Sequence, residues 1–252
     1  MTSLLVDIGN SRVKWARLSR GVLGEQHAAA HGGWTVADWR TALFAGAPVE
    51  RVLASTVAGG ASGAALGEAA RLATGRDAVF AATGREAAGV LNGYADPSLL
   101  GVDRWLAVIG AYRRVRGACV IADAGTAATI DVVAADGRHR GGFIVPGPAL
   151  MVSSLLGGTS DLALRRSSSP PGTEAGFADN TRDAIERGCR VALAALVDRC
   201  VADAATVGGA PPVLLLTGGA AGEIRPHLRT AADHVPDLVL RGLAALVECG
   251  GI

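Results

Sequence analysis

Long apolar runs are missing from this chain of 252 residues, although half of its residues are hydrophobic. Glycine or a charged residue interrupts each apolar stretch well before the ~20 residues that a membrane-spanning helix needs. Asp7 ends the N-terminal apolar stretch after a few residues, so no signal peptide is expected. We therefore expect a soluble, cytoplasmic protein without a membrane segment.

Strong charge of one sign is missing as well. The formal net charge is +1, and basic and acidic residues are interspersed. A surface that holds nucleic acid or a membrane by bulk electrostatics is therefore not expected. Any anion that the protein binds must be held locally.

Cysteine is scarce and lacks the spacing of a metal or redox motif. The four cysteines are Cys119, Cys189, Cys200 and Cys249. None of them forms a CxxC pair or has a histidine nearby, which argues against a zinc site. Buried, reduced thiols are the expected state.

The sequence does contain one short motif that occurs twice. The apolar stretch Ser3–Val6 leads to Asp7 and Ile8-Gly-Asn-Ser, and Ala118–Ala122 leads to Asp123-Ala-Gly-Thr126. Each predicts a buried strand that delivers an aspartate to a glycine turn, where backbone N–H groups and a hydroxyl can meet phosphate. The repeat predicts two similar α/β halves, residues 1–117 and 118–252, with one nucleotide in the cleft between them.

The first turn also has a simpler explanation. Strands over residues 4–8 and 12–18 form a hairpin around Gly9-Asn10-Ser11, in which Asp7 caps its own turn. In the functional alternative, Gly9 allows a close backbone approach and Lys14 directs positive charge toward phosphate. The second copy favours this alternative.

Strands and helices alternate through the rest of the first half, which indicates an α/β fold. A helix is expected over residues 34–44, with Thr35 as N-cap and Asp38 three residues later. Trp34, Trp39 and Leu43 then serve packing. A strand over 52–55, a helix over 62–74 and a strand over 78–82 follow.

A second informative stretch runs from Asn92 and Tyr94 through Pro97 to Gly101-Val102-Asp103-Arg104. Proline and glycine predict a loop, and the apolar spacing from residue 103 to 115 predicts a helix. Asp103 therefore lies at or near a helix N-terminus. Two interpretations stay open: Asp103 caps the helix, with Arg104 solvated, or its carboxylate is a general base.

In the second half, a turn at Asp136-Gly137 leads to a returning strand over residues 141–147. Its paired glycines and Pro146-Gly147 imply a close backbone approach to another strand or a ligand. A short helix over 149–156, a polar loop over 165–172, a long helix from Asn180 or Thr181 to about 201 and a strand over 213–216 follow. The turn Thr217–Ala220 then opens a helix and could receive the nucleoside end of a ligand.

As a set, these motifs resemble the type III pantothenate kinases. This family belongs to the acetate and sugar kinase, Hsp70 and actin superfamily, whose two halves share a ribonuclease-H-like fold. The Asp-x-Gly turns identify the superfamily. The Gly101-Val-Asp-Arg104 loop with Tyr94 upstream selects the family, and Gly141-Gly-x-Ile-x-Pro-Gly147 is a further marker of the resemblance.

The resemblance implies transfer of the ATP γ-phosphoryl group to pantothenate, the first step of coenzyme A biosynthesis. Asp103 would be the catalytic base, and Asp123 would organise Mg²⁺ that accompanies ATP, with K⁺ or NH₄⁺ nearby. The ATP phosphates would be held by Asp7, Ile8, Gly9, Asn10, Ser11, Arg12, Val13, Lys14 and Thr126. Pantothenate would contact Tyr94, Gly101, Val102, Asp103, Arg104 and Thr181.

Members of the resembling family are homodimers whose pantothenate pocket lies at the subunit interface. The apolar face of the 103–115 helix is compatible with such an interface. Two other functions stay open: another enzyme on this scaffold, such as a sugar kinase or a polyphosphate-cleaving phosphatase, and a non-catalytic accessory factor in transcription. The first leaves the Gly101–Arg104 loop unexplained, and the second has no DNA-binding charge to support it.

Overall fold

A computed structural model describes residues 2–157, 177–208 and 211–250. The predicted polar loop over residues 165–172 lies outside this part of the chain. The residues pack into two compact units, of which the first comprises Met1–Gly117, Val133–Gly141 and Asp237–Ile252, and the second Ala118–Val132 and Gly142–Pro236. The proposed division into residues 1–117 and 118–252 stays a proposal. It shares the boundary after Gly117, but two later segments pack with the first unit.

The first unit is built on a six-stranded sheet of order β3-β2-β1-β5-β6, with β4 paired to β2. The strands are β1 (Thr2–Ile8), β2 (Arg12–Ser19), β3 (Val22–Leu23), β4 (His27–Ala30), β5 (Arg51–Thr56) and β6 (Val79–Phe80), with a separate pair β7 (Glu86–Ala87) and β8 (Val90–Leu91). The helices are α1 (Val36–Phe44), α2 (Gly60–Thr74), the 3₁₀ turn η1 (Pro97–Leu99), α3 (Val102–Val115) and α7 (Leu238–Glu248).

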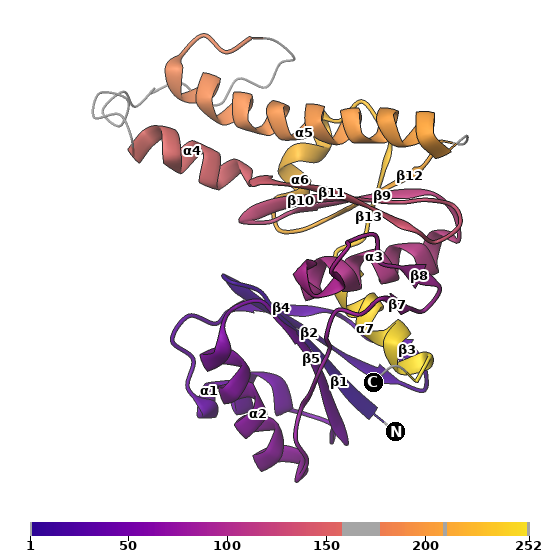
Figure 1. The fold of residues 1–252 in the computed structure, drawn as a ribbon. Coiled ribbons are helices and arrows are strands. Elements are labelled where there is room, and N and C mark those ends of the chain that lie inside the picture. The colour runs from indigo at the N-terminus through magenta and orange to yellow at the C-terminus, as the bar shows by residue number, and fades with distance from the viewer. Residues whose placement is uncertain (1, 158–176, 209–210, 251–252) are drawn as a thin grey trace. The chain divides into compact units, whose positions relative to one another are not determined.

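Successive side chains of β1 point to opposite faces of the sheet, so this strand contributes to the core on both faces. Leu4, Val6 and Ile8 pack with Trp39 of α1 and with α2 on one face. Leu5 is fully buried as well, and its side chain points to the opposite face, where α3 and α7 lie (Figure 1). A strand buried on both faces suits the continuous apolar run that the sequence shows here.

Helix α1 confirms the predicted N-terminus in detail. The Thr35 side chain accepts the Asp38 backbone N–H, and the Asp38 side chain accepts the Thr35 backbone N–H, which makes a capping box. The Thr35 hydroxyl and backbone N–H, as hydrogen-bond donors, lower the pKa of the exposed Asp38 carboxyl. Trp39 and Leu43 are buried, as expected for packing residues.

Helices α3 and α7 touch backbone to backbone through two glycines. A Cβ at Gly242 would lie 2.0 Å from the Leu106 carbonyl oxygen, and a Cβ at Gly110 would lie 2.5 Å from that of Leu238. The apolar face of α3, with Leu106 and Ile109 fully buried, is thus covered within this unit. That face was expected to be compatible with a subunit interface, but the close helix contact already occupies it.

The second unit repeats the strand order of the first in a five-stranded sheet, β11-β10-β9-β12-β13. Its strands are β9 (Cys119–Ala124), β10 (Ala127–Val133), β11 (His139–Pro146), β12 (Val213–Thr217) and β13 (Ala232–His234). Its helices are α4 (Pro148–Gly157), α5 (Thr181–Gly208), α6 (Ala221–Ile224) and the 3₁₀ turn η2 (Arg225–His227). Strand β12 runs parallel to β9, as β5 does to β1.

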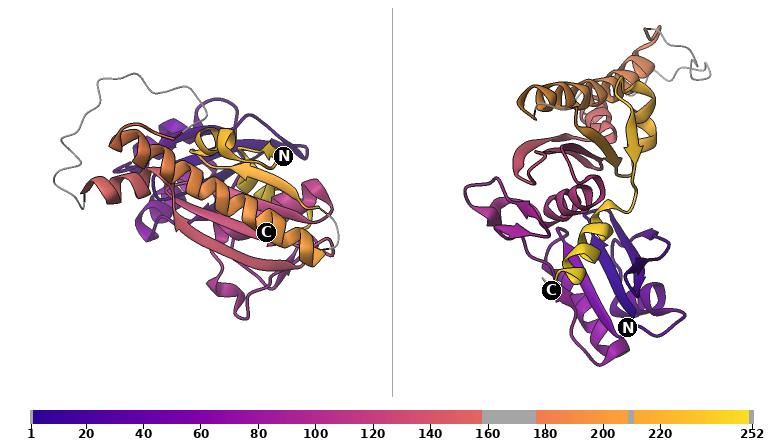
Figure 2. Two further views of the ribbon diagram at one scale, coloured as in Figure 1. Left: turned by 90° about the horizontal axis from the view of Figure 1, so that it is seen from above. Right: turned by 90° about the vertical axis from the view of Figure 1, so that its right-hand side faces the viewer.

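Helix α5 lies along one face of this sheet (Figure 2). Leu193, Val197 and Cys200 of α5 pack on Val120 and Leu214 of the strands. The repeated topology, with strands and helices in both units, confirms the predicted α/β fold with a duplicated half. Helix α6, expected to follow the Thr217–Ala220 turn, is present but has only four residues.

Three of the four cysteines are buried and reduced, as expected, whereas Cys249 is exposed. Burial raises the pKa of the Cys119 thiol to about 12, so this thiol stays protonated at neutral pH. Cys249 is exposed because it follows the end of α7 near the C-terminus. Among the described residues, no helix is both long and apolar enough to cross a membrane.

The glycine contact between α3 and α7 gives a stability prediction. The change Gly242→Ala should lower the free energy of unfolding by about 1–3 kcal/mol, because the added methyl group collides with the backbone of α3. Gly67→Ala in α2 is the matched control. Nothing lies within 4 Å of a Cβ at that helical position, so it should be stabilising by roughly 0.5–1 kcal/mol. Urea unfolding of both variants checks this; equal stability of the two would contradict the close contact.

Candidate functional site

Asp7 stands at the end of the first unit's central strand and is 7% exposed. In the sheet register it lies beside Lys14 of β2 and Ser55 of β5. The Ser55 hydroxyl donates a hydrogen bond of 2.8 Å to Asp7 Oδ1. The predicted carboxylate is therefore fixed by a side chain that the sequence pattern did not indicate.

The turn that follows joins β1 to β2 at residues 9–11, as predicted. The Gly9 N–H donates to the Arg12 carbonyl at 3.0 Å, and Nε2 of His31 lies 2.7 Å from the Gly9 carbonyl oxygen. Asn10, Ser11 and Arg12 are exposed, whereas Ile8 and Val13 are buried. Asn10, Ser11 and Arg12 of the predicted phosphate segment thus face solvent, whereas Asp7, Ile8 and Val13 are buried.

Asn92 organises the loop that leads to Tyr94. It is buried; its Nδ2 donates to the Gly84 carbonyl at 3.2 Å and its Oδ1 accepts the Tyr94 backbone N–H at 3.0 Å. The Arg85 guanidinium donates to the carbonyls of Tyr94 and Ala95 at 3.0 and 2.9 Å. These bonds hold the backbone on both sides of the tyrosine.

The structure brings Tyr94 and Arg104 together, as the predicted substrate set requires. Arg104 is 5% exposed, and its Nη1 donates to the Tyr94 hydroxyl at 2.9 Å. The Tyr94 ring stacks with the ring of the fully buried His139, and the two ring centroids are 5.9 Å apart. Gly93 permits this pairing, because a Cβ there would lie 1.9 Å from the His139 carbonyl oxygen. Sequence reasoning missed His139. Its position two residues before the Gly141 motif was the only feature of the sequence that pointed to a role in the site.

Asp103 lies in the first turn of α3, but it is not the N-cap. Gly101 holds that position and makes no side-chain capping bond. The Asp103 carboxylate instead accepts the Arg104 backbone N–H at 2.8 Å. The cap interpretation was thus wrong about the position, although a carboxylate in the first turn still interacts favourably with the helix dipole. Arg104, which that interpretation left solvated, is buried.

In the second unit, Asp123 lies at the end of β9 opposite Thr217 of β12. This is the register position that Asp7 and Ser55 occupy in the first sheet. Gly218 brings its backbone close to Asp123: its φ is 94°, and a Cβ there would lie 2.4 Å from Asp123 Oδ1. The glycine turn after β12 therefore faces the carboxylate directly.

Thr126 belongs to the two-residue turn between β9 and β10 and is exposed. The Gly147 N–H donates to the Thr126 carbonyl at 2.8 Å, and a Cβ at Gly147 would lie 2.0 Å from the Gly125 carbonyl oxygen. This confirms the close backbone approach predicted for Pro146-Gly147. The Asp123, Thr126, Gly147 and Gly218 segments thus meet at one end of the second sheet.

Thr181 is the first residue of α5 and is exposed. Asn180, the other predicted start, caps the helix: its Oδ1 accepts the Asp183 backbone N–H at 3.0 Å. The Thr181 side chain is therefore not needed for capping.

The donor set fits magnesium bound together with a nucleotide. No cluster of three or more histidine, cysteine, aspartate or glutamate side chains suited to a metal ion occurs among the described residues. Mg²⁺ is commonly held by one or two carboxylates, with phosphate and water oxygens as its other ligands. Asp123, partly buried beside two glycine turns, supplies one such carboxylate.

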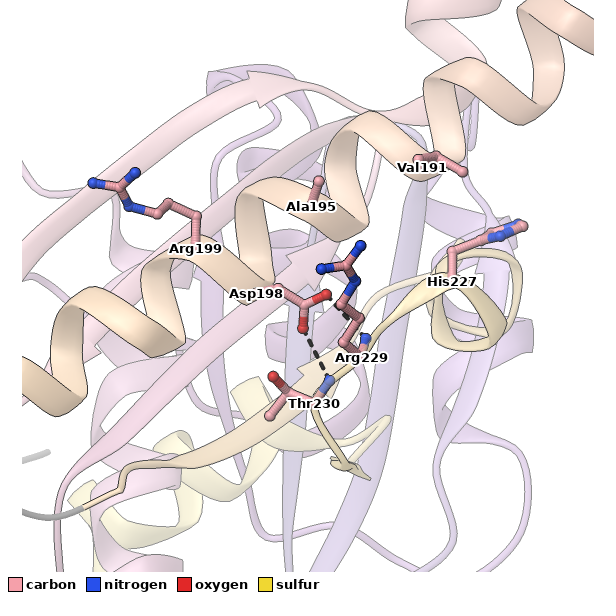
Figure 3. Close-up of a pocket in the computed structure, with 7 residues that line it drawn as sticks. All are labelled: Val191, Ala195, Asp198, Arg199, His227, Arg229 and Thr230. Carbon is pink, nitrogen blue, oxygen red and sulfur yellow. Dashed lines mark hydrogen bonds between the residues drawn. The ribbon is translucent and has the colours of Figure 1, made fainter. Parts of the chain in front are cut away.

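A cavity of about 600 Å³ lies elsewhere in the second unit, between α5 and the segment from η2 to β13 (Figure 3). The Asp198 carboxylate on its wall accepts the backbone N–H groups of Arg229 and Thr230, at 2.9 and 3.0 Å. Burial raises the pKa of Asp198, but these donors outweigh it and lower the pKa overall. None of the predicted site residues lines this cavity, so it is not the candidate active site.

Comparison with known proteins identifies the family. A family model described as type III pantothenate kinase matches residues 3–203. A type III pantothenate kinase of Azoarcus sp. (strain BH72) is 40% identical, over 96% of this chain and 89% of the relative. Its counterpart in Laribacter hongkongensis is 38% identical, over 97% of this chain and 98% of the relative.

Solved structures share the fold at low sequence identity. A conserved putative Baf family transcriptional activator from Campylobacter jejuni has a TM-score of 0.57 at 20% identity, covering 99% of this chain and 100% of that one. Component A of the (R)-2-hydroxyglutaryl-CoA dehydratase of Acidaminococcus fermentans has a TM-score of 0.55 at 13% identity, covering 97% and 95%. At these identities the likeness concerns the fold alone. Together, the family model and the two sequence relatives show that this chain belongs to the type III pantothenate kinases.

Proposed function

We propose that this chain transfers the γ-phosphoryl group of ATP to the primary hydroxyl of pantothenate, the first step of coenzyme A biosynthesis. Family membership supports the reaction. The observation that carries it at the level of residues is the Arg104–Tyr94 hydrogen bond, made directly beside Asp103 at the start of α3. A buried guanidinium that donates to the Tyr94 hydroxyl suits recognition of a polar, anionic acceptor such as pantothenate.

Phosphate binding is assigned to the two glycine turns. Phosphoryl transfer passes through a loose transition state, so alignment and charge neutralisation account for most of the catalysis. Residues 7–14, with Lys14 beside Asp7 in the sheet, supply backbone donors and the positive charges of Arg12 and Lys14. Thr126 supplies a hydroxyl from an exposed turn.

Pantothenate recognition is assigned to Tyr94, the Gly101–Arg104 segment and Thr181. Asp103 is the general base that takes the proton of the attacking hydroxyl, a role typically worth about 10²- to 10⁴-fold in rate. Asp123 orients Mg²⁺ bound with ATP, and a monovalent ion, K⁺ or NH₄⁺, binds nearby. The enzyme acts in the cytoplasm as a homodimer and binds neither nucleic acid nor membrane.

A coupled assay with ATP and pantothenate tests the reaction. Sugars and inorganic polyphosphate in place of the two substrates test the related enzymes on this scaffold. Formation of phosphopantothenate from ATP, without turnover of the substitutes, is the expected result. A chain that binds ATP and phosphorylates none of the acceptors would instead favour a non-catalytic role.

Replacement of Asp103 by Asn tests the base. The amide oxygen can still accept the Arg104 N–H, so the stability cost should stay well under ~1 kcal/mol. Loss of the proton acceptor should lower turnover by on the order of 10² or more, with ATP affinity nearly unchanged. Asp136→Asn, at an exposed turn carboxylate that accepts the Arg138 N–H, is the matched control. Near-normal turnover of the folded Asp103 variant would remove this residue from the mechanism.

Replacement of Asp123 by Asn tests the cation site. The change removes a full negative charge beside the proposed ATP phosphates while keeping the side-chain volume. Activity should fall, and half-maximal activation should require more Mg²⁺ or K⁺. Asp203→Asn on the exposed surface of α5 should leave both titrations unchanged. Identical cation titrations for the Asp123 variant and the wild type would make Asp123 a turn residue only.

Exposed apolar side chains in the second unit support a homodimer. Phe143 and Ile144 of β11 are 57% and 61% exposed, and Leu150 and Leu155 of α4 are 44% and 47% exposed. Exposed apolar patches mark protein interaction sites, and these four side chains lie on two consecutive elements. An isologous dimer would cover them.

Sedimentation at assay concentration should therefore show a dimer. Leu150→Glu should shift the protein toward monomer and lower its activity, because a charge would be buried in the interface. Val22→Glu, at a residue 68% exposed in the first unit, is the control and should stay dimeric. A fully active wild-type monomer would contradict the proposed assembly.

A further inference from the structure

Both backbone polar groups of Gly9 are already used within the first unit. Its N–H donates to the Arg12 carbonyl at 3.0 Å, which closes the turn between β1 and β2. Its carbonyl oxygen lies 2.7 Å from Nε2 of His31, a residue 22 positions further along the chain. The peptide that links Gly9 to Asn10 is therefore held in one orientation from outside the turn.

The orientation of that peptide decides where the next N–H points. The described chain contains no cis peptide bond, and in a trans peptide the C=O and the following N–H point in opposite directions. Because the Gly9 carbonyl points to His31, the Asn10 N–H points away from it. Asn10 is exposed, and within the described residues its N–H donates to no acceptor.

The His31 ring is well suited to act as a fixed donor. A carbonyl oxygen can only accept, so Nε2 carries the hydrogen of this bond. The side chain is 5% exposed, and Nδ1 is buried without a hydrogen-bond partner in the described part of the chain. The Trp39 ring packs at 5.7 Å from the imidazole. In the part of the chain that the structure describes, the bond to Gly9 is thus the single hydrogen bond of this buried ring.

We propose that His31 is a positioning residue for the nucleotide: by holding the Gly9 carbonyl, it directs the Asn10 N–H toward a phosphate oxygen of ATP. This inference rests on the proposed function, which assigns residues 7–14 to the ATP phosphates. A preorganised backbone donor needs no reordering when the anion arrives, so its hydrogen bond contributes fully to affinity. Helix α1, which carries Trp39, thereby takes part in shaping the phosphate turn.

Three substitutions separate the hydrogen bond from packing. His31→Leu keeps the volume but has no donor. His31→Asn keeps an amide, but this amide matches the position of Nδ1 and falls short of Gly9. His31→Gln extends its amide to the place of Nε2 and restores the donor. The Leu and Asn variants should weaken ATP binding, measured by calorimetry without pantothenate, by roughly tenfold, whereas the Gln variant should stay near the wild type.

The kinetic constants and a control variant complete the test. The KM for ATP should rise with the Kd in the Leu and Asn variants, while the KM for pantothenate should not change. His27→Leu, at an exposed histidine of β4, should alter neither. Unchanged ATP affinity in the Leu and Asn variants would overturn the inference. Equal losses in all three variants, accompanied by lower melting temperatures, would also overturn it and leave His31 a packing residue.

Failure of the proposed function gives a different result. A wild-type protein that binds ATP but does not phosphorylate pantothenate would refute the kinase assignment, while the comparison of ATP affinities would still decide the role of His31. Absence of ATP binding to the wild-type protein would overturn both.

Discussion

Both sheets depend on one constraint: a carboxylate stands near the end of the first strand, beside a hydroxyl on the parallel neighbouring strand. Asp7 faces Ser55 in one sheet, and Asp123 faces Thr217 in the other. Parallel strands covered by helices leave little water at such a position, so a charge there needs hydrogen bonds or a ligand. The glycine turn next to each carboxylate exposes backbone groups at that point of the sheet. The same arrangement accompanies the same strand order in both units.

Local patterns were sufficient to predict most elements and both aspartate turns. The Thr35–Asp38 capping box needs only four consecutive residues to be visible, and the hairpin around Gly9 is encoded in its own turn residues. The apolar spacing after Gly101 predicted α3 to within one residue of its start. Such features depend on neighbours in the sequence, where a single chain carries enough information.

The features that could not be predicted join residues far apart in the sequence. His139 lies behind Tyr94, Ser55 bonds Asp7, and Gly242 packs on Leu106. A single buried histidine follows no periodic sequence pattern. The packing role of a glycine within a helix can be recognised only when the position of the opposing backbone is known. The misassigned cap at Asp103 is a local error instead. Gly101 begins the helix without a side-chain acceptor, which leaves the aspartate in the first turn, two residues after the N-cap.

The contact between α3 and α7 also bears on synthesis of the protein. Helix α3 ends at Val115, whereas α7 begins at Leu238, so the first unit stays incomplete until the second unit has been synthesised. At translation rates of about 5–20 residues per second, the apolar face of α3 stays uncovered for on the order of ten seconds before α7 is synthesised. Hydrophobic surface that stays exposed in this way makes a folding intermediate prone to aggregation. The N-terminal core is therefore completed by a helix that is synthesised long after α3.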